Sequence, residues 1–297
     1  MKLEKPIFEG SGVALVTPFD EHGNINYPKL EELIEFQIDK GTDALIICAT
    51  TGEGPALDIV EHIKAVEFAA KQVAGRIPVI AGTGSNDTAF AVKISNEAEK
   101  AGADALLMVT PYYNKTSQSG LVRHYRYISD RVSKPVILYN VPSRTGVNIK
   151  PETYAELAEL DRICAVKEAN GDIAALGKTI DLCGDKLDFY SGNDDQITAM
   201  MSLGAKGVIS VLANVVPEAA CGITHSALEG DFRKSAELQI KYMDLINKLF
   251  MDVNPIPVKD AMNLMGFNVG QCRMPLAPLV PEDRETMKKT LEKYGLI

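Results

Sequence analysis

The sequence lacks the cysteine and histidine patterns of disulfide-rich and metal-binding proteins. Its five cysteines are an odd number without a Cys-x-x-Cys pair, and its four histidines show no ligand spacing. We therefore expect a reduced, cytoplasmic protein without structural disulfides and without a metal site. Two of the histidines, His62 and His124, are predicted to lie on helix surfaces.

Positive charge and long apolar runs are also missing. The net charge of −9 argues against a nucleic-acid partner, because phosphate backbones attract basic surfaces. No stretch approaches the roughly 18 apolar residues of a membrane span. The start of the chain, residues 1–6, has no apolar core of a signal peptide. The sequence therefore predicts neither a membrane nor a nucleic acid as partner.

Short apolar runs recur along the first two thirds of the chain. They lie at residues 12–16, 44–49, 77–81, 105–109, 135–139, 162–169, 187–190 and 207–211. Continuous runs of this length fit strands that are buried on both faces. Segments with helical spacing separate them, such as the one in which Leu30, Leu33, Ile34 and Ile38 share a face. This alternation predicts a parallel sheet with right-handed crossovers.

Eight strand–helix units that close on themselves form a (β/α)₈ TIM barrel, and an open doubly wound sheet is the competing arrangement. The count favours the barrel, as do the polar residues that follow nearly every run, because all strand ends of a barrel face one mouth. Only helical segments follow residue 211, near 217–229, 232–251, 257–265 and 282–293, with a stiff joint at Asn254-Pro255-Ile256-Pro257. We expect a barrel over residues 1–230 and a C-terminal helical extension over residues 231–297.

The sixth apolar run contains Lys167, the first candidate for chemistry. A buried ammonium is costly unless it is paired or used, and burial favours the neutral, nucleophilic amine. Such an amine forms a Schiff base with a ketone. The run alone favours an ordinary lysine that reaches water or pairs with Glu168. The barrel reverses that preference, because it places Lys167 in the mouth and Glu168 on the opposite face of the strand.

Other strand ends supply groups that can serve a Schiff-base lysine. The hydroxyls of Thr50, Thr51, Tyr113 and Tyr139 follow three other runs and can relay protons to a carbinolamine. Beyond the fifth run, Arg144 can clamp a substrate carboxylate with two hydrogen bonds. These groups turn a lone lysine into a candidate active site for a keto acid.

The seventh run ends in a second candidate carboxylate site. Backbone amides near Ser191 and Gly192 are placed to hold a carboxylate. The following pair, Asp194-Asp195, is predicted to begin a helix, where acids complement the helix dipole. Lys259 lies on an extension helix rather than at a strand end, so we do not expect it to form a Schiff base.

Four strings, in order along the chain, resemble those of one enzyme family. They are Thr50-Thr51-Gly52-Glu53, Thr110-Pro111-Tyr112-Tyr113-Asn114, Tyr139-Asn140-Val141-Pro142-Ser143-Arg144-Thr145-Gly146 and Val166-Lys167-Glu168-Ala169. Over essentially its whole length the chain resembles the dihydrodipicolinate synthase family, one of the class I aldolases that include N-acetylneuraminate lyase. The lysine strand is shared by that wider group, whereas the string with Arg144 is much more specific to the synthases.

The resemblance implies a lyase that condenses pyruvate with L-aspartate 4-semialdehyde on the route to diaminopimelate and lysine. It implies that Lys167 forms the imine with pyruvate and that Tyr139 is the general acid/base beside it. Thr50 would relay protons between Tyr139 and Tyr113, and Tyr113 would come from a neighbouring subunit of a homotetramer, a dimer of dimers. No cofactor is expected, because the imine itself is the electron sink.

The substrate-binding residues also follow from the resemblance. Thr51 would hold the pyruvate carboxylate, and Arg144 would bind the carboxylate of the semialdehyde. Gly192 and Ile209 would shape the pocket through their backbone carbonyls. Strand two departs slightly from the family pattern, because Ala49 stands where many members have a glycine before the threonine pair. We expect activity to survive this change.

A larger departure falls at the site where lysine-inhibited members bind their effector. Ile59 stands where a histidine is usual, Phe90 where an acid is usual, and Gly54-Pro55 replaces small residues. The positions that match are His62, Asn86 and Tyr112. Without the acid, the ammonium of the effector loses its partner. We therefore expect an enzyme that is insensitive to lysine.

Two other functions remain open at the level of sequence. The first keeps the chemistry but cleaves a sugar acid, such as N-acetylneuraminate or a 2-keto-3-deoxy acid, and Arg144 argues against it because those relatives need hydroxyl-binding residues there. The second is a catalytically silent barrel that acts as a sensor or scaffold. The retained Lys167, Tyr139, Thr50 and Tyr113 argue against that function.

Overall fold

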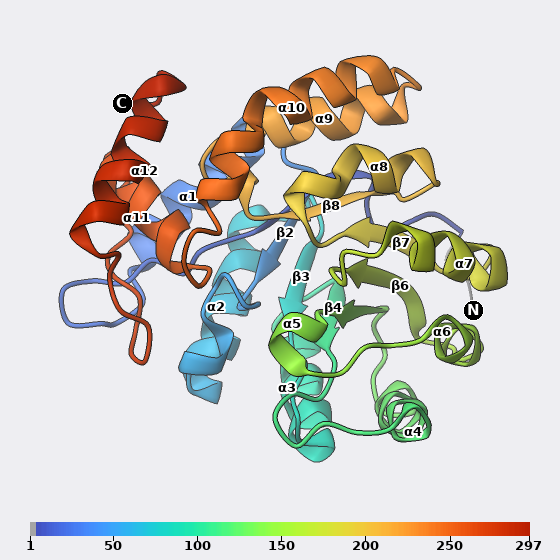
Figure 1. Cartoon of the computed structure of the whole chain (residues 1–297). Coiled ribbons are helices and arrows are strands. Elements are labelled where there is room, and N and C mark those ends of the chain that lie inside the picture. The colour runs from blue at the N-terminus through green and yellow to red at the C-terminus, as the bar shows by residue number, and fades with distance from the viewer. Residues whose placement is uncertain (1–3) are drawn as a thin grey trace.

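The computed structural model describes residues 4–297 and shows a closed barrel of parallel strands (Figure 1). Residues 1–3 lie outside that range. They belong to the segment 1–6, in which we expect no signal peptide. The strands are β1 (Gly10–Ala14), β2 (Ala44–Ile47), β3 (Val79–Gly82), β4 (Ala105–Val109), β5 (Val136–Asn140), β6 (Ile163–Glu168), β7 (Asp188–Ser191) and β8 (Gly207–Ser210). Pairing of β1 with β8 closes the ring and excludes the doubly wound sheet. The predicted barrel is confirmed.

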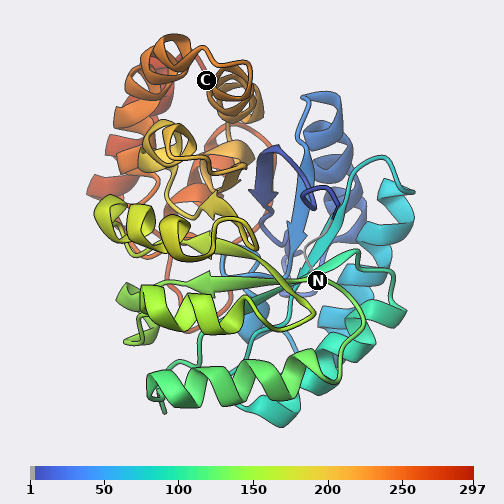
Figure 2. The ribbon, with the colours of Figure 1, turned by 90° about the vertical axis from the view of Figure 1, so that its right-hand side faces the viewer.

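Helices alternate with the strands and surround them (Figure 2). They are α1 (Tyr27–Asp39), α2 (Ile59–Val73), α3 (Thr88–Lys100), α4 (Gln118–Ser129), α5 (Pro142–Thr145), α6 (Pro151–Leu157), α7 (Ile173–Cys183), α8 (Ile197–Ser202), α9 (Pro217–Leu228), α10 (Phe232–Lys248), α11 (Ile256–Leu264) and α12 (Pro281–Lys293). Three short 3₁₀ turns are η1 (Gly54–Ala56), η2 (Asp194–Gln196) and η3 (Leu212–Asn214). Within residues 4–297 no helix is both long and apolar enough to cross a membrane.

The apolar runs form strands because both of their faces are covered. One buried cluster fills the barrel and includes Ile46, Leu107, Ile137 and Ile209. A second and larger cluster lies between the strands and the helices. Phe8 precedes β1 and stacks on Tyr190 with the ring centroids 4.3 Å apart, which plugs the end of the barrel opposite the mouth. The interior of the barrel is therefore packed, which directs the search for a ligand site to the strand ends.

The last three helices form the predicted extension, gathered at one side of the barrel in orange and red (Figures 1 and 2). The proposed division after residue 230 falls between α9 and α10 and stays a prediction. Lys259 of α11 ties the extension to the loop after β2. Its buried Nζ donates to Glu53 Oε1 at 2.9 Å and to the carbonyls of Thr17 and Gln271, both at 3.0 Å. Lys259 is thus fully paired, which agrees with its exclusion as a Schiff-base lysine.

The prediction that His62 and His124 lie on helix surfaces is wrong. Their exposed fractions are 4% and 7%, because each sits on the inward face of its helix, α2 and α4 respectively. Burial lowers the pKa of both imidazoles to about 4, so both are neutral at physiological pH. His62 lies at helical spacing from the buried Ala65 and Val66, and His124 from the buried Leu121 and Ile128, so the spacing indicated an inward face that the polar residue type obscured.

Candidate active site

Lys167 and Tyr139 lie side by side at the carboxyl ends of two neighbouring strands. They are partners in the register of β5 and β6, so their side chains point to the same face of the sheet. That face is the barrel interior, where Tyr139 belongs to the inner cluster. Only 4% of Lys167 is exposed, and its Nζ lies 4.3 Å from the centroid of the Tyr139 ring.

The surroundings of Lys167 favour a neutral amine. Burial is the main cause that lowers its pKa to about 8, from an ordinary value of 10.5. The Asp194 carboxyl opposes this shift, whereas the Arg144 guanidinium adds to it. In the part of the chain that the structure describes, Lys167 Nζ contacts the Tyr139 ring and feels the charge of Asp194, whereas Lys259 Nζ forms an ion pair with Glu53. The lowered pKa raises the fraction of Lys167 that is present as the free amine, the form that attacks a ketone.

Thr50 connects Tyr139 to the loop that follows β2. Burial raises the pKa of the Tyr139 phenol, and the charge of Arg144 and a hydrogen bond from Thr50 oppose that rise. The loop is a tight turn in which Glu53 N donates to Thr50 O at 3.1 Å. Tyr139 therefore remains a neutral phenol with a hydroxyl neighbour, which suits proton relay.

The two residues proposed to bind carboxylates meet at a residue of the extension. Thr51 is buried, and its Oγ1 accepts a hydrogen bond from Asn254 Nδ2 at 3.0 Å. Arg144 lies on the short helix α5, and its Nη2 donates to the main-chain carbonyl of Asn254 at 3.1 Å. Asn254 was expected only as part of a stiff joint. Its contacts with both Thr51 and Arg144 make it a residue of the site.

Gly192 directly follows β7, and Ile209 lies on β8; that their backbone carbonyls shape the pocket stays a prediction. A Cβ at Gly192 would sit 2.7 Å from Ala169 Cβ, 3.0 Å from Glu168 O and 3.2 Å from Lys167 Cε, so only glycine leaves room for the lysine. Ile209 belongs to the cluster inside the barrel. The Gly192 amide donates to Glu168 O at 2.7 Å. The expectation that this amide holds a substrate carboxylate is therefore wrong, because strand pairing already occupies it.

Tyr113 is the one proposed catalytic residue that the chain does not bring to Lys167. It is 91% exposed, and its φ of 65° lies in the left-handed region that non-glycine residues rarely adopt. Strained backbone of this kind is concentrated at functional positions. A single chain thus assembles Lys167, Tyr139 and Thr50 and holds the fourth hydroxyl out on the surface.

Glu168 faces away from the lysine, as strand alternation predicted. Its carboxyl accepts from Tyr154 OH at 2.8 Å and from Asn140 Nδ2 at 2.9 Å, in the layer between the sheet and the helices. Burial raises its pKa to about 7, against the opposing hydrogen bonds from Tyr154 and Asn140. Asn140 and Glu168 are register partners on β5 and β6, directly after Tyr139 and Lys167. This network holds the two strand ends together.

Asp194 is a residue that the sequence analysis placed only at a helix start. It does begin η2, but its buried carboxyl also accepts from the amides of Val211 and Leu212, at 2.9 and 2.8 Å. It lies near enough to Lys167 for each charge to affect the pKa of the other group. Its acidic type was visible in the sequence, whereas its partner was not. It supplies the only acidic influence on the lysine recorded in the part of the chain that the structure describes.

A cavity of about 220 Å³ opens beside Thr50 and Tyr139. Its lining includes most positions of the implied effector site, namely Gly54, Pro55, Ile59, His62, Phe90 and Tyr112. Asn86 instead lines a separate cleft. The walls of the cavity carry no acidic side chain, since its full lining is apolar or neutral at physiological pH. In residues 4–297 no group of three or more metal-ligating side chains occurs.

Comparison with known proteins matches this fold and site to one family. The model of the dihydrodipicolinate synthetase family matches residues 7–294. The 4-hydroxy-tetrahydrodipicolinate synthase of Thermoanaerobacter sp. (strain X514) is 53% identical over 293 residues, which cover 98% of each chain. The crystal structure of dihydrodipicolinate synthase from Aquifex aeolicus superposes with a TM-score of 0.95 at 45% identity, and covers 97% of this chain and 99% of its own.

A third relative is known with a small keto acid bound. It is the chloride-inhibited dihydrodipicolinate synthase of Acinetobacter baumannii in complex with pyruvate, with a TM-score of 0.95 at 41% identity, covering 97% of this chain and 99% of that one. Because these matches span nearly the full length of each protein, they confirm the predicted family, lyase class and activity. The chain belongs to the dihydrodipicolinate synthetase family.

Proposed function

We propose that this chain is a 4-hydroxy-tetrahydrodipicolinate synthase that joins pyruvate to L-aspartate 4-semialdehyde through a Schiff base at Lys167. The activity follows from relatives of that name that match over nearly their full length and are 53% and 50% identical in sequence. The assignment of the steps to residues is carried by one observation, a buried lysine whose Nζ lies 4.3 Å from the centroid of the Tyr139 ring.

The neutral amine of Lys167 attacks the ketone carbon of pyruvate to give a carbinolamine. Loss of water from that carbinolamine gives the imine, which then loses a methyl proton to become an enamine. The enamine carbon forms the new bond to the aldehyde carbon of the semialdehyde, and the aldehyde oxygen takes up a proton. Tyr139 and Thr50 carry these protons, since Thr50 is a hydroxyl neighbour that affects the pKa of Tyr139, and Tyr139 lies beside the amine. The substrate amine then displaces Lys167 as the ring closes.

Thr51 and Arg144 hold the two carboxylates in this proposal. Thr51 lies buried next to the relay residue Thr50, which suits the smaller ligand, pyruvate. Arg144 is exposed at the mouth and keeps free N–H groups for a bidentate contact with the semialdehyde. Gly192 and Ile209 leave space for the adduct.

The enzyme works in the cytoplasm as a homotetramer. In that assembly, Tyr113 of a second copy of the chain completes the proton relay. The support is its 91% exposure and its left-handed backbone, which are costly in a single chain. Mixing inactive Lys167→Met subunits with inactive Tyr113→Ala subunits tests the shared site. Hybrids should regain part of the activity, because one kind of site then has both residues intact. No recovery on mixing, with subunit exchange verified by mass, would contradict a shared site.

Borohydride reduction in the presence of pyruvate tests the lysine assignment. We expect a three-carbon adduct on the peptide that carries Lys167 and none on the peptide that carries the fully bonded Lys259. No adduct, or an adduct on a different lysine, would overturn the mechanism. Coupled turnover with L-aspartate 4-semialdehyde, set against cleavage of N-acetylneuraminate, separates the synthase from a sugar-acid aldolase.

A further inference from the structure

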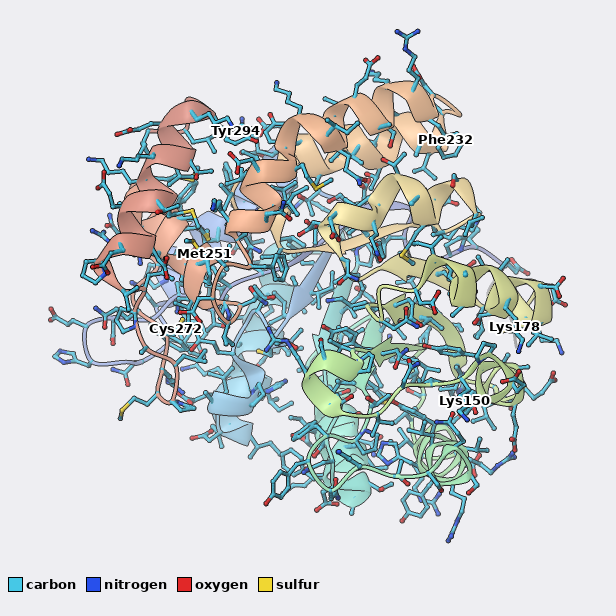
Figure 3. The ribbon with its side chains drawn as sticks, in the orientation of Figure 1. Lys150, Lys178, Phe232, Met251, Cys272 and Tyr294 are labelled. Carbon is cyan, nitrogen blue, oxygen red and sulfur yellow. The ribbon has the colours of Figure 1, made fainter. Side chains whose placement is uncertain are left out.

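Asn254 has contacts that the proposed mechanism leaves unused. It lies in the joint after α10, close to Met251, which Figure 3 labels between the end of α10 and α11. Its exposed fraction is 6%. The side chain donates to Thr51, and the main chain accepts from Arg144. A single residue of the extension thus lies between the groups assigned to the two substrate carboxylates.

The other side-chain atom of Asn254 has no partner. Its Oδ1 is buried, and no hydrogen-bond donor in residues 4–297 reaches it. A buried acceptor without a donor loses its hydration and gains nothing in return, so such atoms are rare and call for a ligand or a water. The contrast with Lys259, five residues further on, is sharp, because all three of its N–H groups have acceptors. The joint is well bonded except at one atom in the active site.

The two substrates differ in whether they can donate a hydrogen bond to Asn254 Oδ1. Pyruvate carries no hydrogen-bond donor, whereas L-aspartate 4-semialdehyde carries an ammonium on the carbon next to its carboxylate. If Arg144 holds that carboxylate, the ammonium lies within two bonds of the group that touches Asn254. Arg144, whose Nη2 contacts Asn254, is a cation and cannot accept from it. An amide oxygen accepts from an ammonium without adding a charge beside the pyruvate carboxylate.

We propose that Asn254 is a specificity-determining residue, whose Nδ2 orients Thr51 for pyruvate and whose Oδ1 accepts from the ammonium of L-aspartate 4-semialdehyde. This inference rests on the proposed function. It predicts that the enzyme distinguishes the natural aldehyde from succinic semialdehyde, which has the same chain and carboxylate but no ammonium. Asn254 provides that discrimination.

The experiment compares the two aldehydes at saturating pyruvate in the wild type and in Asn254→Ala. We expect the KM for L-aspartate 4-semialdehyde to rise about tenfold or more, while the inhibition constant of succinic semialdehyde changes by less than about threefold. Asn254→Asp keeps an acceptor and should restore most of the preference for the aldehyde that bears the ammonium. Asn247→Ala, at an exposed asparagine of α10, is the matched control and should leave both constants unchanged.

Equal losses for the two aldehydes in Asn254→Ala, or no loss for either, would overturn the inference, because a merely structural role does not sense the ammonium. Trapping of pyruvate on Lys167 by borohydride reports whether each variant is folded. If Asn254→Ala does not fold, Asn254→Leu, which has a similar size and no acceptor, carries the same comparison. Absence of wild-type turnover with L-aspartate 4-semialdehyde would instead refute the proposed function.

Discussion

Replacing Lys167 by methionine should abolish activity and make the protein more stable at neutral pH. Burial holds the pKa of Lys167 at about 8 in the folded state, against an ordinary 10.5. The folded state therefore binds fewer protons than the unfolded chain between these two values, so stability rises with pH through that window. The lowered pKa of Lys167 reduces the free energy of unfolding by about 3 kcal/mol at pH 7 and by about 2 kcal/mol at pH 9. Methionine fills a similar volume and carries no charge to desolvate.

The net gain is smaller than that cost, because Asp194 loses its cationic neighbour. Its Oδ2 keeps the hydrogen bonds from the Val211 and Leu212 amides, whereas its Oδ1 is buried without a hydrogen-bond partner among residues 4–297, so loss of the neighbouring charge offsets part of the gain. We expect Lys167→Met to gain about 1–3 kcal/mol at pH 7 and about 1 kcal/mol less at pH 9. Thermal midpoints measured at one fixed protein concentration report this difference. Midpoints shift by about 2–4 °C per kcal/mol in domains somewhat smaller than this chain.

Lys259→Met is the matched control, because both lysines are buried and both have a lowered pKa. Removal of Lys259 leaves Glu53 without its ion-pair partner, so we expect a loss of roughly 3–5 kcal/mol rather than a gain. The opposite signs distinguish a poised lysine from a structural one. A Lys167→Met protein no more stable than the wild type at pH 7, or a difference that does not shrink toward pH 9, would refute the reasoning.

Three further outcomes can be tested by turnover. Millimolar L-lysine should leave the rate unchanged, because Phe90 and Ile59 offer its ammonium no acid. Phe90→Glu combined with Ile59→His should introduce inhibition. Strong inhibition of the wild type by L-lysine would contradict this prediction. Gly192→Ala should lower kcat at least tenfold, because its Cβ falls 3.2 Å from Lys167 Cε and a clash of this kind costs about 1–3 kcal/mol. An unchanged kcat would show that the residues around Gly192 shift to accommodate the methyl group. Thr50→Val should lower kcat about 100-fold or more while pyruvate trapping persists; an unchanged kcat would exclude Thr50 from the relay.

The sequence alone determined the eight strand–helix units, the strand that carries Lys167 and the motif with Arg144. These features are local, because the run of apolar residues, the helical spacing and the strand ends are each written in a few consecutive residues. Alternation along a strand was enough to turn Glu168 away from Lys167, and the structure agrees. The helices of the extension also lie at nearly the predicted bounds.

Only the tertiary structure decided which residues meet across the closed barrel. Asn254 bonds to Thr51 across 203 positions of sequence, and the Gly192 amide proved to be occupied by strand pairing. The physical reason is that local patterns specify elements and faces, whereas contacts between distant residues depend on how the ring closes and what packs against it.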